Sequence, residues 1–457
     1  MSRSEEIAAW LPGRLAELVA ESGVPGAQAA VLVDGEYVDA AAGVLSLDTG
    51  VEVTTDAVFQ IGSITKVWTA TLVMQLVDDG LLDIDEPIVT YLPEFRVADP
   101  RATAAITPRH LLNHTSGVDG DLFHPTGRGD DAVEKYVGTI TDAQQVHEPG
   151  AMFSYCNTGY TVLGRLVEVL RGKTFGAAVH DHIAKPLGLA HVATNSDEAI
   201  MFRAAVGHVD RDGEVVPAPV WSLEPSTAPA GSLLAMRARD LLVWANAHLG
   251  GGAPLLSEAS AKAMREHQVD VPPIGVLAGG WGLGWELFDH GADVFGHDGG
   301  TIGQMAFLRI SGAADFAVAL LTNSLDGLRI YRGLVEDLLR EHAGADVPEL
   351  PTPPAEPEPL DADLVTGTYL TPLVGFTVGV DEDGRGWVDT TPISDEAKIL
   401  LKPTRDEFVR LREDAIIGVE EAHGRHQVLA LVGRDGQGRA EYLFNGRAAV
   451  RTEGEGR

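Results

Sequence analysis

The stretch Phe59-Gln-Ile-Gly-Ser63-Ile-Thr-Lys66-Val-Trp68 places a serine three residues before a lysine. The following residues, 64 to 77, are mostly apolar and end at Asp78-Asp79-Gly80, a pattern that predicts a helix. Residues three apart share a helix face, so the Lys66 amine can reach the Ser63 hydroxyl. A serine needs a base to become a nucleophile, and burial favours the neutral, basic form of a lysine. The helix dipole would stabilise negative charge developing at Ser63.

A second motif, Phe153-Ser-Tyr155-Cys-Asn157, follows a Pro149-Gly150 turn and precedes a helical pattern that begins at Thr158. A tyrosine can transfer protons when a nearby cation lowers its pKa, and Lys66 is the expected cation. The two-sided amide of Asn157 can bind both Lys66 and a substrate amide. A buried tyrosine followed by an asparagine that caps a helix would give the same sequence pattern. A functional interpretation of this motif therefore depends on the Ser63–Lys66 motif.

The third motif is Phe295-Gly-His297-Asp298-Gly-Gly300-Thr-Ile-Gly-Gln304. Glycines on a strand let backbone N–H groups approach a ligand closely. Acyl transfer needs two such donors to bind the oxyanion of its intermediate. A glycine-rich hairpin with an ordinary histidine is the alternative interpretation.

Composition narrows the classes of function. The chain has 457 residues, 45% of them hydrophobic and 22% charged, which indicates a globular protein of two or three domains. Its net charge of −33 disfavours nucleic acids and anionic membranes as partners. With Cys156 as its one cysteine, the chain forms no intramolecular disulfide. We see no signal peptide and no apolar run of ~18 residues, so we expect a cytoplasmic protein.

The order of elements favours an α+β domain whose sheet uses both ends of the chain. After an N-terminal helix that ends near Gly23, residues 27 to 46 resemble a hairpin around Asp34-Gly35. Helical patterns dominate residues 63 to 247, strands return between 281 and 322, and a last helix is predicted over 329 to 342.

A Pro-rich spacer, Pro348 to Pro359, is the clearest domain boundary. We therefore expect a first domain over 1–345, a linker over 346–360 and a small antiparallel β-barrel over 361–457. The predicted strands of the barrel are 366–370, 376–380, 386–390, 398–402, 407–412, 427–432 and 440–444.

Together the three motifs resemble those of the serine β-lactamase and penicillin-binding-protein family, in its class C-like and esterase-like branch. The resemblance covers about residues 7 to 342. It implies a β-lactamase/transpeptidase-like domain, with an antiparallel sheet flanked by helices plus a helical region. The layout of that domain followed by a lipocalin-like barrel is similar to the penicillin-binding-protein-type thioesterases. Further similar text lies at Ile106–Gly117, Pro186–Leu189, Ala230–Leu234 and Trp281–Trp285.

The resemblance also implies roles. Ser63 would be the acylated nucleophile and Lys66 its base, with Tyr155 sharing the proton transfers. Asn157 would position Lys66 and the substrate amide, and His297 would line the pocket where the family often has a lysine.

Four further residues complete the expected site. The backbone N–H groups of Ser63 and Gly300 would form the oxyanion hole. Asp298, Gly299 and Glu224 are candidates for substrate binding, and Asp298 replaces the usual Thr or Ser, so it would repel a carboxylate and attract an amine. We expect no metal and no cofactor.

The resemblance implies acyl-enzyme chemistry on a peptide-like, ester or thioester substrate. We favour a thioesterase that acts in trans on a peptidyl carrier domain and closes a nonribosomal peptide head to tail. An intracellular esterase or a D-amino-acid-specific peptidase or amidase is the alternative. A β-lactamase or DD-carboxypeptidase would work outside the cytoplasm and need an export signal, which disfavours both. A non-catalytic acylated sensor is the least favoured, because the Ser63, Lys66, Tyr155 and Asn157 set is intact.

Overall fold

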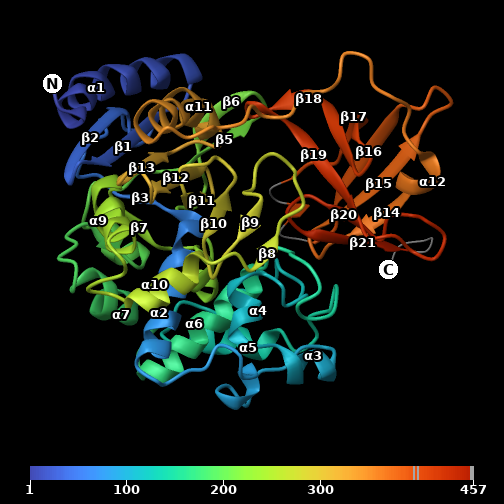
Figure 1. Cartoon of the computed structure of the whole chain (residues 1–457), viewed down its shortest axis with the longest axis horizontal. Coiled ribbons are helices and arrows are strands. Elements are labelled where there is room, and N and C mark those ends of the chain that lie inside the picture. Colours follow the sequence, from blue (N-terminus) through green and yellow to red (C-terminus); the bar gives the residue numbers. More distant parts are fainter. Residues whose placement is uncertain (395–396, 399–400, 453–457) are drawn as a thin grey trace.

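The computed structural model describes residues 1–394, 397–398 and 401–452. A large sheet covered by helices occupies one side of the molecule, and a barrel built from the C-terminal part of the chain packs beside it (Figure 1). The α+β architecture with an appended β-barrel that the sequence predicts is confirmed.

The main sheet is antiparallel and draws on both ends of the first part of the chain. Its eight strands follow the order β2-β1-β13-β12-β11-β10-β9-β8, so the N-terminal β1 pairs with β13 as expected. The strands are β1 (Gly26–Val33), β2 (Glu36–Gly43), β8 (Val269–Asp270), β9 (Gly280–Trp281), β10 (Glu286–Phe288), β11 (Val294–Thr301), β12 (Gln304–Ser311) and β13 (Phe316–Thr322).

The predicted hairpin turn is present between β1 and β2. Asp34 and Gly35 both have positive φ, 53° and 75°. Two-residue turns of this kind match the twist of the strands they join, which explains the Asp-Gly pair.

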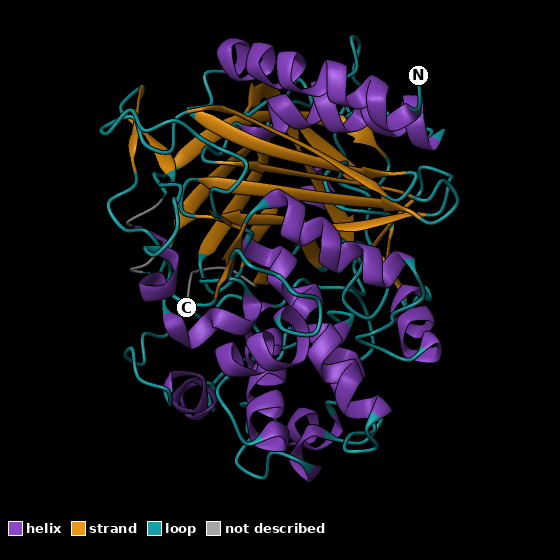
Figure 2. Cartoon of the chain, turned by 90° about the vertical axis from the view of Figure 1, so that its left-hand side faces the viewer, coloured by secondary structure: helices purple, strands orange, loops and turns teal. Residues whose placement is uncertain are grey.

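Helices cover both faces of this sheet (Figure 2). α1 (Arg3–Ser22) and α11 (Gly327–Leu338) pack on one face through residues such as Leu15 and Leu334, both fully buried. α2 (Thr65–Asp78) lies on the other side and is buried almost all round, with Val67 and Trp68 fully buried. A helix that is apolar on every side belongs inside a protein, and this burial fixes the position of Lys66.

The sequence analysis missed short strands within and just before the region predicted as helical. β3 (Phe59–Gln60), just before Ser63, pairs with β7 (Ala235–Met236), which also pairs with β4 (Val192–Ala193). Strands of two residues carry no periodic signal. The remaining elements are β5 (His208–Arg211), β6 (Glu214–Pro217), α3 (Pro100–Ala105), α4 (Pro108–Leu112), α5 (Ala132–Thr139), α6 (Asn157–Arg171), α7 (Phe175–Val179), α8 (Ser196–Ala199), α9 (Ala238–Leu249) and α10 (Glu258–Arg265).

The C-terminal part forms a closed antiparallel barrel after a short helix, α12 (Ala362–Val365). Two of its strands, β18 and β21, were missed by the sequence analysis. The predicted strand over 398–402 includes residues 399 and 400, which lie outside the described residues. The barrel strands are β14 (Gly367–Leu370), β15 (Val374–Val380), β16 (Gly386–Pro392), β17 (Thr404–Arg412), β18 (Ala415–Ala422), β19 (Arg425–Val432), β20 (Tyr442–Phe444) and β21 (Ala448–Thr452).

Among the described residues, no helix combines the length and the apolar character needed to cross a membrane.

Candidate active site

Ser63 lies in a tight 3-10 turn, Gly62–Ile64, that leads directly into α2. The expected position at a helix entrance is therefore close to what is observed. The turn is pressed against the third motif, since a Cβ on Gly62 would lie 2.6 Å from the Gly300 nitrogen. Gly62 also has φ of 51°, so both space and backbone conformation require glycine here. The first and third motifs, far apart in sequence, thus meet through their backbones.

Lys66 projects from the first turn of α2 toward Ser63. Its Nζ lies 3.0 Å from Ser63 Oγ and donates to the Ala230 carbonyl at 2.6 Å. The side chain is fully buried, and burial lowers the pKa of Lys66 well below its usual value, with the nearby Arg447 charge adding to the effect. A neutral amine in this position can accept the proton of Ser63.

Tyr155 completes the cluster from the other side. Its side chain interacts with that of Ser63, and Lys66 Nζ lies 4.8 Å from the centre of its ring. The expectation that a cation lowers the pKa of Tyr155 is wrong. Burial is the largest effect and raises that pKa, because the surroundings disfavour a phenolate. Tyr155 therefore stays protonated and is suited to donate a proton.

His114 and Cys156 hold Tyr155 in place. The His114 ring stacks on the Tyr155 ring at 4.3 Å, and its Nδ1 accepts a hydrogen bond from the Cys156 backbone at 3.0 Å. The Cys156 thiol caps α6 by accepting from the Gly159 N–H. Burial raises the pKa of Cys156 to about 12, so the thiol is not a nucleophile at neutral pH.

Asn157 has a different partner from the one the sequence suggests. Its Nδ2 donates to Asp121 Oδ1 at 2.5 Å, and no bond from its side chain to Lys66 is observed in the described part of the chain. Asp121 in turn accepts from Arg447 Nε at 2.6 Å and Nη2 at 3.2 Å. The Arg447 guanidinium lies 4.9 Å from the centre of the Tyr155 ring.

Arg447 and Asp121 are the site residues that the sequence analysis missed. Arg447 lies on the turn between β20 and β21. The Asn445-Gly446 pair predicts a turn there, but does not predict a contact with the site. The turn is held against the second motif, since Tyr155 N–H donates to the Gly446 carbonyl at 3.0 Å. The barrel therefore forms one wall beside the cluster of Ser63, Lys66 and Tyr155.

Strand β11 offers a backbone donor next to Ser63. The Asp298 N–H bonds to Glu286 on β10, so it points to that edge of the strand. Because N–H directions alternate along a strand, the Gly300 N–H points to the same edge. The Ser63 nitrogen lies 3.2 Å from where a Cβ on Gly299 would be. This arrangement is compatible with the expected oxyanion hole of Ser63 and Gly300, which stays a prediction.

His297 lies beneath the cluster. Its side chain is 1% exposed, and its ring packs against Trp281 at 5.4 Å. Its Nδ1 donates to the Asp298 carbonyl at 2.6 Å, and burial lowers the pKa of His297 to about 3. His297 is thus a neutral support of the site wall, and its contact with a substrate stays a prediction.

Asp298 does not offer the free negative charge expected of it. The Arg309 guanidinium, nearly fully buried, binds its carboxylate through both Nη atoms, at 2.6 and 3.2 Å. The pair cancels the charge that would have attracted an amine or repelled a carboxylate. Glu224 is exposed, just before the turn Pro225–Ala230 that ends at the Lys66 acceptor. Its role in binding stays a prediction.

Replacing Arg447 by glutamine is expected to move the rising limb of the pH–rate profile upward by about one pH unit, the lower end of the usual effect of a nearby charge. The variant removes a cation that lowers the pKa of Lys66, and leaves Asp121 to raise it. The measurement is kcat/KM for a p-nitrophenyl ester from pH 5 to 10.

A matched control is Arg405→Gln, which removes a surface barrel arginine paired with Asp389 at 2.5 Å. It should leave the profile unchanged. An Arg447→Gln variant that unfolds at the wild-type temperature and keeps the wild-type profile would show that Arg447 does not act on Lys66.

Comparison with known proteins places this geometry in context. The family model described as Beta-lactamase matches residues 12–338. Penicillin-binding protein 4 of Amycolatopsis lactamdurans is 44% identical over 365 residues, which cover 78% of this chain and 96% of that protein. Esterase EstB of Burkholderia gladioli is 29% identical over 61% of this chain and 79% of its own length.

Among solved structures, that of SurE aligns with a TM-score of 0.78 and 30% identity, covering 98% of this chain and 100% of SurE. A second structure, of SurE with D-Leu, aligns with a TM-score of 0.74 and 31% identity over the same shares. These alignments extend over the barrel as well as the sheet domain.

Proposed function

Since the chain belongs to the beta-lactamase family of serine hydrolases, we propose that it forms an acyl-enzyme on Ser63 and acts as a thioesterase that releases and cyclises a peptide. The observation that carries the acyl-enzyme is the convergence of three side chains. Ser63 Oγ has the buried Lys66 amine at 3.0 Å, and the Tyr155 side chain interacts with it from the other side.

Acylation starts from neutral Lys66. Its amine takes the Ser63 proton while Oγ attacks the carbonyl carbon of the thioester. The carbonyl oxygen becomes an oxyanion and binds the N–H groups of Ser63 and Gly300. When the intermediate collapses, the thiol leaves with a proton from Tyr155, and the Lys66 ammonium returns a proton to Tyr155.

Deacylation reverses the roles. An incoming amine attacks the ester carbon, and the Tyr155–Lys66 pair takes its proton and returns one to Ser63 Oγ. If the amine is the N-terminus of the bound peptide, the product is a ring. If water attacks, the product is a linear acid.

Two observations support a peptide substrate over a small ester. The similarity to SurE runs through the whole chain, and one structure of SurE holds D-Leu, which favours a D-residue at the acyl position. The barrel also places Arg447 beside the cluster, a wall that a small ester would not require. The similarity to esterase EstB keeps an esterase as the second candidate, with a D-peptidase or amidase beside it.

A peptidyl carrier domain remains the proposed donor of the thioester. Carrier domains tend to be acidic, and the net charge of −33 on this chain gives no long-range attraction to such a partner. Docking would depend on a local basic or apolar patch.

The decisive experiment uses synthetic peptidyl thioesters with N-acetylcysteamine as the leaving group. We expect a peptide ending in D-Leu to give cyclic product, with kcat/KM at least about tenfold above the L-Leu epimer, the scale on which a pocket discriminates small differences. Intact-mass analysis detects the acyl-enzyme, and mass spectrometry of the products separates ring from acid.

The outcomes separate the candidates. A linear acid alone from both epimers would favour the esterase, and cleavage of D-amino-acid amides in preference to thioesters would favour the peptidase. Absence of any adduct on Ser63 would contradict the proposal as a whole.

A further inference from the structure

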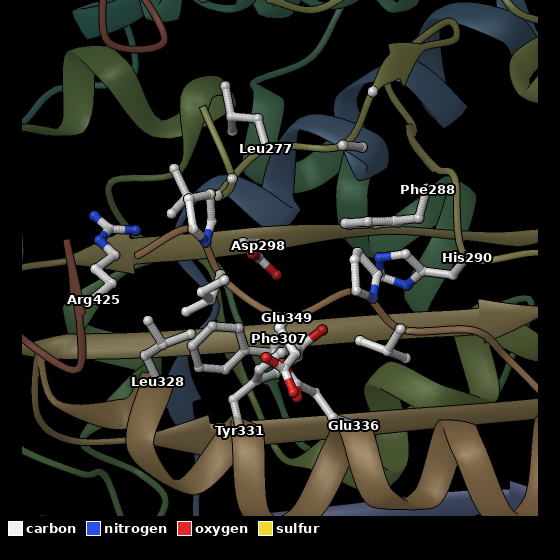
Figure 3. A pocket seen from close by; sticks show the side chains of 18 of the residues that line it. Leu277, Phe288, His290, Asp298, Phe307, Leu328, Tyr331, Glu336, Glu349 and Arg425 are labelled. Carbon is white, nitrogen blue, oxygen red and sulfur yellow. The ribbon is translucent and has the colours of Figure 1, made fainter. Parts of the chain in front are cut away.

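A cavity of about 570 Å³ lies where the sheet, the linker and the barrel meet. Figure 3 shows Asp298 and Phe307 of the sheet and Leu328 of α11 around it, with Leu277 on the opposite wall and Arg425 of the barrel at one side. Most of the lining side chains are apolar, and the volume is within the usual range for ligand pockets, roughly 300–1,000 Å³.

Strand β11 separates this cavity from the nucleophile. Residues two apart on a strand share a face, so Asp298 and Gly300 face the cavity together with their cross-strand partners Phe307 and Met305. Gly299 faces the other way, and a Cβ there would lie 1.9 Å from the Ile61 carbonyl oxygen. A Cβ on Gly300 would meet no atom within 4 Å. Gly300 thus borders both the nucleophile and the cavity.

Among the described residues, one edge of β11 has no partner strand at this point. β10 pairs with residues 294 to 296 of β11, and in the described chain no strand pairs with residues 297 to 301 on that side. On this edge the Asp298 N–H and C=O already bond to Glu286 and His297. By the alternation along the strand, both the N–H and the C=O of Gly300 point to the same edge. An extended peptide can add to such an edge through its main chain, and its side chains then alternate between the two faces.

Two carboxylates that line the cavity are paired with arginines. Asp298 is paired with Arg309 at 2.6 Å, and Glu336 is paired with Arg340 at 3.0 Å. Burial lowers the pKa of His290 to about 4, so this ring is neutral as well. An apolar occupant would therefore leave neither Asp298 nor Glu336 without a partner, and a buried carboxylate without a partner would be costly.

We propose that this cavity binds one large apolar side chain of the acyl segment attached to Ser63, with the main chain of the segment bonded to Gly300 at the unpaired edge of β11. The inference rests on the proposed acyl-enzyme. It adds a specificity pocket built jointly by the sheet domain, the linker and the barrel, on the opposite face of β11 from the nucleophile.

The test is a side-chain scan of the substrate. Tripeptidyl N-acetylcysteamine thioesters carry either alanine or phenylalanine at each of the three positions before the thioester carbonyl. We expect one position at which phenylalanine raises kcat/KM by about tenfold or more, the scale of burying a large apolar side chain. The cavity-filling variants Leu328→Trp and Leu277→Trp approach from different walls, and each should reduce that preference to about twofold or less.

Leu47→Trp is the matched control, because Leu47 is 47% exposed and does not line the cavity. It should keep the wild-type preference, and all variants should turn over the all-alanine substrate at the wild-type rate. Leu328→Phe and Leu277→Phe are smaller changes, and each replaces the tryptophan variant at its own position if that variant fails to fold.

The outcomes distinguish this inference from the proposed function. No preferred position in the wild type, or a preference that survives filling from both walls, overturns the role of the cavity while adducts on Ser63 still form. Loss of every adduct contradicts the acyl-enzyme instead.

Discussion

Replacement of Ser63 by alanine is expected to abolish the covalent acyl adduct and to lower the turnover of p-nitrophenyl esters by at least ~10⁴-fold, the scale reached when a serine nucleophile is removed. The hydroxyl is the reacting atom in the proposed mechanism, and the described residues supply no second nucleophile beside Lys66. Cys156 is buried and its pKa is raised to about 12. Intact-mass analysis after incubation with the ester, together with steady-state rates, measures both effects.

Ser196→Ala is the matched control, since Ser196 is half-buried at the start of α8 and its side chain takes no part in the site. It should keep the wild-type rate and the adduct. An adduct of unchanged mass in Ser63→Ala would assign the nucleophile to another residue and would overturn the mechanism. A lost adduct in both variants would point to a defect in folding.

Local sequence signals were enough for the parts of the site that depend on short spacings. Ser63 and Lys66 are three residues apart, and the apolar run after them can only be a buried helix, so their convergence follows from helical geometry. The Asp34-Gly35 turn could be predicted for the same reason, as could the sheet that joins the two ends of the first domain. Turn chemistry and periodicity are local properties of a sequence.

Contacts between distant segments were not readable. Arg447 reaches Asp121 across 326 positions of sequence, through a turn whose residues signal a hairpin and nothing more. Nothing in a single sequence reports which loop of one domain packs against another. The sequence analysis therefore assigned no barrel residue to the site, although the β20–β21 turn bonds directly to Tyr155.

The error at Asp298 has the same origin. From the sequence alone, we expect Asp298, beside the glycines of the third motif, to carry an unpaired negative charge. Its partner Arg309 stands on the neighbouring strand, and pairing between strands depends on a register that the sequence does not state. Tyr155 shows the corresponding error in electrostatics. Burial of the phenol raises its pKa. Burial also lowers the pKa of Lys66, which disfavours the charged form of the expected cation.

Replacement of Lys66 by alanine is expected to lower kcat/KM by ~10²–10⁴-fold, the usual contribution of a positioned general base. The active form of Lys66 is the neutral amine. Activity should therefore rise with pH as Lys66 loses its proton, and reach its plateau well below pH 10.5, because burial lowers the pKa of Lys66. In Lys66→Ala this rising limb should disappear, and the residual rate should follow hydroxide concentration.

Lys66→Arg separates the base from the charge. Arginine keeps a cation near Ser63 but does not lose its proton in this pH range, so this variant should be as inactive as alanine at every pH. Added methylamine should restore part of the activity of Lys66→Ala, in proportion to its unprotonated fraction. Lys262→Ala, at an exposed position of α10, is the control and should behave as wild type. If Lys66→Arg retained the wild-type rate, the positive charge and not proton transfer would be the contribution of Lys66, and Tyr155 would have to take the proton from Ser63.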